Sequence, residues 1–352
     1  MTKSAAADHV GDLGVDLVAL RSCVHDANLG SGPLTDARTI GGGTQNIMLR
    51  FSCDSREFVL RRGPAHLRST TNDNLRREIR LLTALADTPV PHAKLIHACL
   101  DETILGGSVF YLMEPIDGFN AAVELPEPHA SSPSIRYQMG LSLVEALAEL
   151  SMVDYKAAHL GDFGRPEGFL DRQVPRWLRE LDSYASSDGY PGHSLPVEKV
   201  AAWLNRNQPA SGPVGIMHGD YHLANVMFGY GGPYVAAIVD WEMATIGDPL
   251  LDLGWLLATW PEPDEASDVI GSELARAGSL PPAHELVRIY GERTGYDVSA
   301  ADWYAVLACF KLGILLEGTY ARSCAGLAPA DVGHRLHHTA TALFTRALTL
   351  TN

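Results

Sequence analysis

The chain has 352 residues, 46% of them hydrophobic, and a formal net charge of −15 at pH 7. This length allows two domains with substantial cores, and the negative charge argues against nucleic acid or an anionic membrane as a partner. Five scattered cysteines without CxxC spacing indicate reduced thiols rather than structural zinc. We find no signal-peptide pattern and no uninterrupted apolar run of about 18 residues, so we expect a cytoplasmic protein.

The N-terminal part begins with a predicted helix over residues 12–29, where apolar side chains recur at helical spacing. Two strand-like runs then flank a glycine cluster at residues 41–43. Such a cluster lets backbone N–H groups approach a phosphate closely. A flexible hairpin turn is the alternative interpretation, and these residues alone leave both open.

The next predicted strand, residues 58–62, ends in two arginines and precedes an amphipathic helix over residues 74–85 that carries Glu78. Strand alternation places Arg61 and Arg62 on opposite faces of the sheet. On these residues alone, both arginines could be merely an exposed strand end.

A predicted strand pair follows and ends at Met113, with its turn at glycines 106–107. Pro115 and Gly118 come next and mark a boundary. We therefore predict two domains, residues 1–116 and 117–352. The second domain is mainly helical, with helices expected over residues 135–158, 283–293, 301–320 and 339–350.

Two groups of charged residues in the second domain suggest opposite substrates. Arg172, Arg176 and Arg179 share one helix face and form either a solvated surface or a site for an anionic substrate. A later acidic cluster could bind a cationic substrate or be a solvated loop. It consists of Glu262, Asp264, Glu265 and Asp268.

The most informative stretch is residues 216–255. Asp220 and Asn225 have the spacing of a kinase catalytic loop, and Asp240 follows an apolar run that predicts a buried strand. A glycine-rich hairpin at 229–233 would bring Asn225 and Asp240 side by side, as two oxygen ligands for magnesium.

The same stretch closes with Asp248 and Pro249, which predict the start of a helix over residues 250–257. This helix is apolar on nearly all sides and should be buried. Asp252 lies inside it, and a buried carboxylate needs hydrogen-bond donors.

With His-Gly-Asp at 218–220 and Gly-Asp-Pro at 247–249, this stretch resembles the aminoglycoside phosphotransferase family. The resemblance implies an α+β, two-lobed protein-kinase-like fold, with an antiparallel sheet and helix in the N-lobe and a mainly helical C-lobe. It also implies that Asp220 is the catalytic base, that Asn225 and Asp240 bind Mg²⁺, and that Asp252 braces the catalytic loop. His218 is expected to position the loop without titrating.

The resemblance also implies how the N-lobe binds ATP. Gly42, Gly43 and Thr44 would cover the phosphates, and Glu114 would lie in the hinge beside the adenine. Arg61 stands where kinases have a lysine, with Glu78 as its partner. Arginine is larger and forked but can still neutralise phosphate charge, so a modified active site is expected.

The segment from Gly161 to Trp177 is similar to the kinase-like domain fused to certain acyl-CoA dehydrogenases and to free-standing bacterial relatives. Ser151 departs from this branch, in which histidine is common at that position. The branch favours a hydroxyacyl-CoA-like acceptor for a phosphoryl group from ATP. The alternatives are an aminoglycoside-type antibiotic kinase and a nucleotide-binding pseudokinase, the last because of Arg61 and the Asp-Trp-Glu at 240–242. Each enzyme interpretation implies a small-molecule hydroxyl acceptor as partner.

Overall fold

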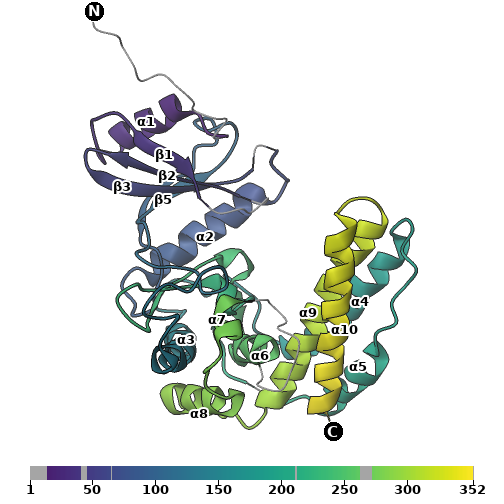
Figure 1. Ribbon diagram of the computed structural model, residues 1–352. Helices are drawn as coiled ribbons and strands as arrows, with labels where there is room; N and C mark the ends of the chain where they lie inside the picture. Colours follow the sequence, from purple (N-terminus) through teal and green to yellow (C-terminus); the bar gives the residue numbers. More distant parts are fainter. Residues whose placement is uncertain (1–13, 41–45, 65, 211, 262–271, 352) are drawn as a thin grey trace, which may run out of the picture. The chain divides into compact units, whose positions relative to one another are not determined.

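The computed structural model describes residues 14–40, 46–64, 66–210, 212–261 and 272–351 (Figure 1). The chain divides into two compact units, one of residues 1–87 and 92–116 and one of residues 88–91 and 117–352. The first unit is built on a sheet and the second is mainly helical, which gives an α+β protein.

The first unit contains a five-stranded antiparallel sheet with the order β1-β2-β3-β5-β4. Its strands are β1 (Thr35–Thr39), β2 (Ile47–Cys53), β3 (Arg56–Arg62), β4 (Leu95–Cys99) and β5 (Phe110–Met113). Two helices, α1 (Leu17–Asp26) and α2 (Thr71–Leu85), lie on opposite sides of this sheet (Figure 1). The sheet therefore has two covered faces, and neighbouring residues of β3 meet different helices.

Alternation along the central strands decides which side chains face each helix. Phe51 and Phe58 stack on each other with ring centroids 5.4 Å apart, and Leu60 joins them in the core that also contains Leu20 of α1. Arg61, next to Leu60, consequently points to the side of α2. The sequence pattern had predicted these strands and both helices, although α1 is shorter than expected because the Asp16 side chain caps it at Val18 and Ala19.

The second unit contains eight helices within the described residues. They are α3 (Pro133–Ser151), α4 (Gln173–Ser183), α5 (Val197–Arg206), α6 (Leu250–Thr259), α7 (Glu273–Ala277), α8 (Ala283–Thr294), α9 (Ala301–Cys324) and α10 (Ala330–Leu350). Two short antiparallel pairs complete it: β6 (Gly215–Met217) with β9 (Thr245–Gly247), and β7 (Val226–Phe228) with β8 (Val235–Ile238). The β7–β8 pair is the predicted glycine hairpin.

In the second unit, two helix bounds differ most from those predicted. The helix expected to reach residue 158 ends at Ser151, because the Asp154 side chain accepts hydrogen bonds from the amides of Lys156 and Ala157 and forms a turn instead. The last helix begins at Ala330 rather than near residue 339. By contrast, α6 is buried along its whole length as predicted, and Asp248 caps it through the amide of Leu250.

Helix α9 is long and apolar enough to cross a membrane by length and composition, but 72% of its apolar window is buried inside the protein. It packs against α4, α5, α6 and α10, and Figure 1 shows α10 running alongside it. We therefore interpret α9 as the core helix of the second unit.

The contact between α6 and α9 depends on Gly254. A Cβ atom at this position would lie 2.4 Å from the backbone carbon and oxygen of Tyr304, which cannot move without shifting α9. This close approach brings the two helices together behind the 216–225 segment.

We predict that Gly254→Ala lowers the free energy of unfolding by about 1–3 kcal/mol, because overpacking against backbone exceeds the helix propensity gained from alanine. Chemical denaturation measures the effect. Gly161→Ala, where an added Cβ meets no atom within 4 Å, is the control. A Gly254→Ala protein as stable as the control would contradict this account of the α6–α9 contact.

Candidate active site

Arg61 and Glu78 form the predicted pair in the first unit. The Arg61 Nε lies 2.8 Å from Glu78 Oε2, and its Nη2 donates to Oε1 at 3.0 Å. Tyr111 from β5 also donates its hydroxyl to Glu78 Oε2, at 2.8 Å. Both side chains are buried, so the alternative of an exposed strand end is wrong. Glu78 thus holds the guanidinium through an ion pair and one charge-assisted hydrogen bond.

Arg62 is also buried, which the sequence did not indicate. Its Nε donates to the carbonyl of Gly63 and its Nη1 to that of Gly14, both at 3.2 Å. Burial lowers the pKa of its guanidinium. The two arginines thus differ in partner as strand alternation predicted: Arg61 binds a carboxylate, whereas Arg62 binds backbone carbonyls.

The other predicted nucleotide contacts in this unit are less informative. Glu114 is exposed, and its amide donates to the carbonyl of Lys94 at 2.9 Å, so this N–H is not available to an adenine. Gly42, Gly43 and Thr44 lie outside the described residues.

In the second unit, the loop between β6 and β7 brings Asp220 and Asn225 together. Asn225 Nδ2 donates to the Asp220 backbone carbonyl and to Asp220 Oδ2, both at 2.9 Å. His222, which sequence analysis missed, places its Nε2 3.3 Å from Asp220 Oδ1. Its position two residues after Asp220 was the available signal. Both carboxylate oxygens of Asp220 therefore have a fixed neighbour.

The β7–β8 hairpin brings the segment before Asp240 to Asn225. The amide of Val239 donates to the carbonyl of Asn225 at 2.9 Å, so Asp240 directly follows a residue bonded to Asn225. Asp240 has a left-handed backbone, with φ of 66° and ψ of 64°. A non-glycine residue adopts this conformation at some cost, and such outliers cluster at functional sites.

The residues present fit a magnesium ion. Both hydrogens of Asn225 Nδ2 are used by Asp220, which leaves the Asn225 Oδ1 as the group that can accept a cation. The described residues contain no cluster of three or more His, Cys, Asp or Glu side chains that could hold a metal. A two-oxygen protein site suits Mg²⁺, which takes its remaining ligands from phosphate and water.

The electrostatics keep Asp220 ionised. Burial acts to raise its pKa, but the hydrogen bond and charge of His222, with smaller effects of His218 and Lys311, outweigh burial and lower the pKa to about 2. At neutral pH the carboxylate is therefore charged and able to accept a hydrogen bond from a hydroxyl.

His218 and Asp252 hold the start of this loop from behind. Asp252 accepts hydrogen bonds from the amides of His218 at 2.5 Å and Gly219 at 2.8 Å, as predicted for a brace. His218 bonds the Val239 carbonyl through Nε2 at 2.9 Å and accepts from the Asp220 amide through Nδ1 at 3.3 Å. Burial lowers the pKa of His218, so the ring is neutral, in agreement with a positioning role.

Sequence analysis also missed Lys311, which donates its ammonium to the Gly219 carbonyl at 3.0 Å. The available signal was a lysine in the otherwise apolar run 303–316. Ser151, the departure noted above, bonds the Tyr290 hydroxyl at 2.6 Å and the Leu147 carbonyl at 2.8 Å.

Neither the arginines of residues 172–179 nor the acidic cluster of residues 262–268 identifies a substrate. Arg172 ends a 3₁₀ helix (Leu170–Arg172) that leads directly into α4. Its guanidinium donates to the carbonyls of Arg165 and Glu167, so the side chain turns back to the preceding segment and does not extend a stripe along α4. Arg176 and Arg179 are exposed. The acidic cluster at 262–268 lies outside the described residues.

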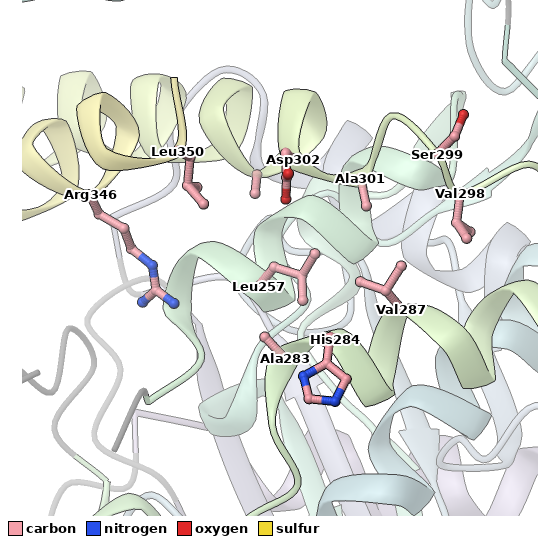
Figure 2. Close-up of a pocket in the computed structure, with 11 residues that line it drawn as sticks. Leu257, Ala283, His284, Val287, Val298, Ser299, Ala301, Asp302, Arg346 and Leu350 are labelled. Atoms are coloured by element: carbon pink, nitrogen blue, oxygen red, sulfur yellow. The ribbon is translucent and has the colours of Figure 1, made fainter. Parts of the chain in front are cut away.

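A hollow of about 300 Å³ opens elsewhere in the second unit, between α6, α8, α9 and α10. Figure 2 shows apolar side chains such as Leu257, Val287 and Val298 around it, with His284 and Arg346 at its edge. None of the predicted site residues lines it. We therefore place the candidate active site at the 218–225 loop and not at this hollow.

Curated relatives match most of the chain. It is 31% identical over 291 residues to "Acyl-CoA dehydrogenase family member 11" of Rattus norvegicus, which covers 81% of this chain and 36% of the relative. It is 28% identical over 291 residues to family member 10 of Mus musculus, covering 81% of this chain and 26% of that protein. The chain thus spans about a quarter to a third of these relatives.

Solved structures share the fold. A candidate aminoglycoside phosphotransferase from Ralstonia eutropha JMP134 is 27% identical, with a TM-score of 0.76 over 95% of this chain and 99% of the other. The macrolide 2'-phosphotransferase MphH from Brachybacterium faecium has a TM-score of 0.58 and 18% identity, covering 92% of this chain and 97% of the other. The fold is therefore the two-lobed, kinase-like fold that the sequence had predicted.

A third structure, aminoglycoside phosphotransferase APH(4)-Ia in complex with ADP and hygromycin B, is 13% identical with a TM-score of 0.56, covering 93% of this chain and 97% of the other. The sequence model of the phosphotransferase enzyme family, APH, matches residues 36–290. This match spans more than half of the chain, and the chain therefore belongs to the APH phosphotransferase family.

Proposed function

We propose that this phosphotransferase moves the γ-phosphoryl group of ATP to a hydroxyl of a small molecule with the help of Mg²⁺. The observation that carries the proposal is the arrangement of Asp220, Asn225 and Asp240: Asn225 donates both Nδ2 hydrogens to Asp220, while its backbone carbonyl fixes the residue before Asp240. Asn225 thus connects the proposed base, through its side chain, to the segment that carries Asp240, through its backbone carbonyl.

Asp220 would act on the acceptor. Its ionised carboxylate would accept a hydrogen bond from the acceptor hydroxyl and take the proton as that oxygen bonds to the γ-phosphorus. The bond from the γ-phosphorus to the β–γ bridging oxygen would break in the same step, and ADP would leave. A carboxylate with so low a pKa is a weak base, and phosphoryl transfer asks mainly for positioning and charge stabilisation. The hydrogen bond from Asn225 to Oδ2 then serves to aim Asp220, while His222 fixes Oδ1.

Asn225 and Asp240 would hold the magnesium ion, which when bound offsets charge on the phosphate oxygens. Arg61 would supply a further positive charge to the phosphates in place of the lysine of other kinases. Its ion pair and hydrogen bond with Glu78, which is itself held by the Tyr111 hydroxyl, keep the guanidinium in one orientation. This ordered pair supports an active enzyme over a pseudokinase.

The relatives favour a hydroxyacyl-CoA-like acceptor, because those with 28–31% identity are named acyl-CoA dehydrogenase family members. A specific observation also supports an antibiotic kinase: one neighbour of the same fold binds ADP and hygromycin B. ADP release in the presence of hydroxyacyl-CoA thioesters and, separately, of aminoglycosides distinguishes the two. No ADP release above that without acceptor, across both sets, would contradict the proposed transfer to either class.

The first prediction for this site concerns the base. Asp220→Asn should abolish transfer while leaving the Kd for ATP within about three-fold, since the carboxylate contacts the acceptor rather than the nucleotide. Transfer assays and calorimetry measure the two effects. The exposed Asp188→Asn is the control, and a mutant at position 220 that still turns over removes Asp220 from this role.

The second concerns the metal. Asp240→Ala should weaken magnesium-dependent ATP binding by roughly 10- to 100-fold, the equivalent of losing one charged interaction of about 1.5–3 kcal/mol. Asp240→Gly is the matched control, because it also removes the carboxylate but accepts the left-handed backbone without strain. Both variants should bind ATP equally weakly with magnesium and like wild type without it. Full affinity in the glycine variant would assign the effect to the backbone.

The third concerns the phosphate-contacting arginine. Arg61→Ala should lower kcat/KM for ATP by about 1.5–3 kcal/mol in transition-state free energy, and Arg61→Lys should retain more activity than alanine. Arg62→Ala should leave kcat/KM for ATP largely unchanged but reduce stability, since its guanidinium binds two backbone carbonyls. Steady-state kinetics with thermal unfolding separates these effects. Equal losses of kcat/KM from both alanine variants would contradict the different roles assigned here.

A further inference from the structure

Lys311 is a charged side chain in the middle of the core helix α9, with 6% of its surface exposed. Burying an ammonium costs several kcal/mol unless it finds partners, and a hydrophobic side chain of similar volume is often equally or more stabilising. Packing within α9 therefore does not require a lysine at this position. The reason for a lysine has to lie in the contacts that its ammonium makes.

The contacts of Lys311 lead to the catalytic loop. The Nζ donates to the Gly219 carbonyl at 3.0 Å and lies 4.3 Å from the ring centroid of Trp255 in α6, with Trp177 of α4 at 5.6 Å. An ammonium over an indole face is held by the charge distribution of the ring. Among the residues that the structure describes, the ammonium thus has one hydrogen-bond acceptor, the carbonyl of the residue immediately before Asp220.

Gly219 is held by charged groups at both ends. Its amide donates to Asp252 of α6 and its carbonyl accepts from Lys311 of α9. It has a φ of +86°, and a Cβ atom here would lie 2.6 Å from the carbonyl oxygen of Met243, so only glycine fits. Without a side chain of its own, this residue depends on its neighbours to fix its orientation.

The peptide plane between Gly219 and Asp220 is fixed in the same way. Its carbonyl oxygen accepts from Lys311, and its N–H, which belongs to Asp220, donates to His218 Nδ1 at 3.3 Å. Because this plane carries the Cα of Asp220, its rotation would re-aim the carboxylate. A displacement of about 1 Å at a reacting group can cost on the order of 100-fold in rate.

We propose that Lys311 is a positioning residue for phosphoryl transfer, whose ammonium fixes the peptide plane before Asp220 and balances the charge of Asp252. This inference rests on the proposed function above, and it adds a residue far along the chain to the proposed machinery. Lys311 contacts neither acceptor nor nucleotide in this account; it acts through Gly219.

The charged groups that act on Lys311 come from three elements. Burial lowers its pKa to about 8, opposed by Asp252 from α6 and Asp220 from the loop, while Arg176 from α4 lowers it further. The ammonium should therefore be present at neutral pH and lost as the pH rises through about 8. If it positions the loop, kcat should fall over that range.

The test compares Lys311→Met with Glu317→Gln. Methionine fills similar volume over Trp255 without the charge. Glu317→Gln also removes a buried charge from α9, but its partners are Tyr190 and His337, which do not belong to the catalytic loop.

We expect Lys311→Met to lower kcat by about 10- to 100-fold with the KM for ATP within about three-fold, and to lose the alkaline fall of kcat. Glu317→Gln should retain wild-type kcat and the fall near pH 8. Lys311→Arg should recover part of kcat because it restores a donor.

Hydrogen exchange provides a readout that does not need an acceptor. Peptides that contain residues 216–224 should exchange faster in Lys311→Met than in wild type and in Glu317→Gln, at equal thermal unfolding midpoints. Unchanged loop exchange with kcat within two-fold of wild type overturns the inference, as does a loss explained by global destabilisation in both variants. If the wild type transfers phosphate to no acceptor, the proposed function fails, and loop exchange alone decides whether Lys311 fixes the loop.

Discussion

The candidate site depends on one interaction, the two hydrogen bonds that the buried carboxylate of Asp252 accepts from the amides of His218 and Gly219. They tie the loop that carries Asp220 to helix α6, which is buried along its whole length. Burial raises the pKa of Asp252 to about 7 despite these bonds and the nearby charge of Lys311. The carboxylate thus lies at a position where its charge has to be balanced, and α9 supplies the balancing cation.

The rest of the second unit follows from this anchor. Gly254 lets α9 approach α6 closely enough for Lys311 to reach the Gly219 carbonyl, and Trp255, the next residue in α6, provides the ring that the ammonium covers. The hairpin β7–β8 then returns the chain to Asn225 and sets Asp240 beside it. Core packing and site geometry are therefore determined by the same two helices.

Much of the candidate site could be predicted from the sequence, because its residues lie close together in the chain. The spacing of Asp220 and Asn225, the glycine hairpin, the apolar strand before Asp240 and the helix after Asp248 all lie within forty consecutive residues, where turn chemistry and periodicity apply. The pairing of Arg61 with Glu78 was predicted from the resemblance, because kinases pair the lysine at this position with a glutamate of the following helix. Strand alternation added only that Arg62 faces the other side of the sheet. The burial of Arg62 was not predicted, since it depends on the carbonyl of Gly14 in the segment before α1.

The contact of Lys311 with Gly219 could not be predicted from local sequence patterns. Ninety-two residues separate it from Gly219, and no periodicity connects a helix near the C-terminus to a particular carbonyl. The end of α3 at Ser151 was not predicted for a different reason. The apolar pattern continues past Ser151, and the helix is interrupted by the turn that the Asp154 side chain forms. Long-range contacts and side-chain-to-backbone bonds are the two kinds of information that the sequence pattern lacked.

We propose above all that Asp220, Asn225 and Asp240 form a working phosphotransfer site. The most direct test is ³¹P NMR of the wild-type protein with ATP, magnesium and the acceptor that gives the greatest ADP release. We expect a phosphomonoester resonance that grows in step with ADP and requires magnesium. Bound ATP that remains intact, or phosphorus released only as inorganic phosphate in the presence of acceptor, would contradict it.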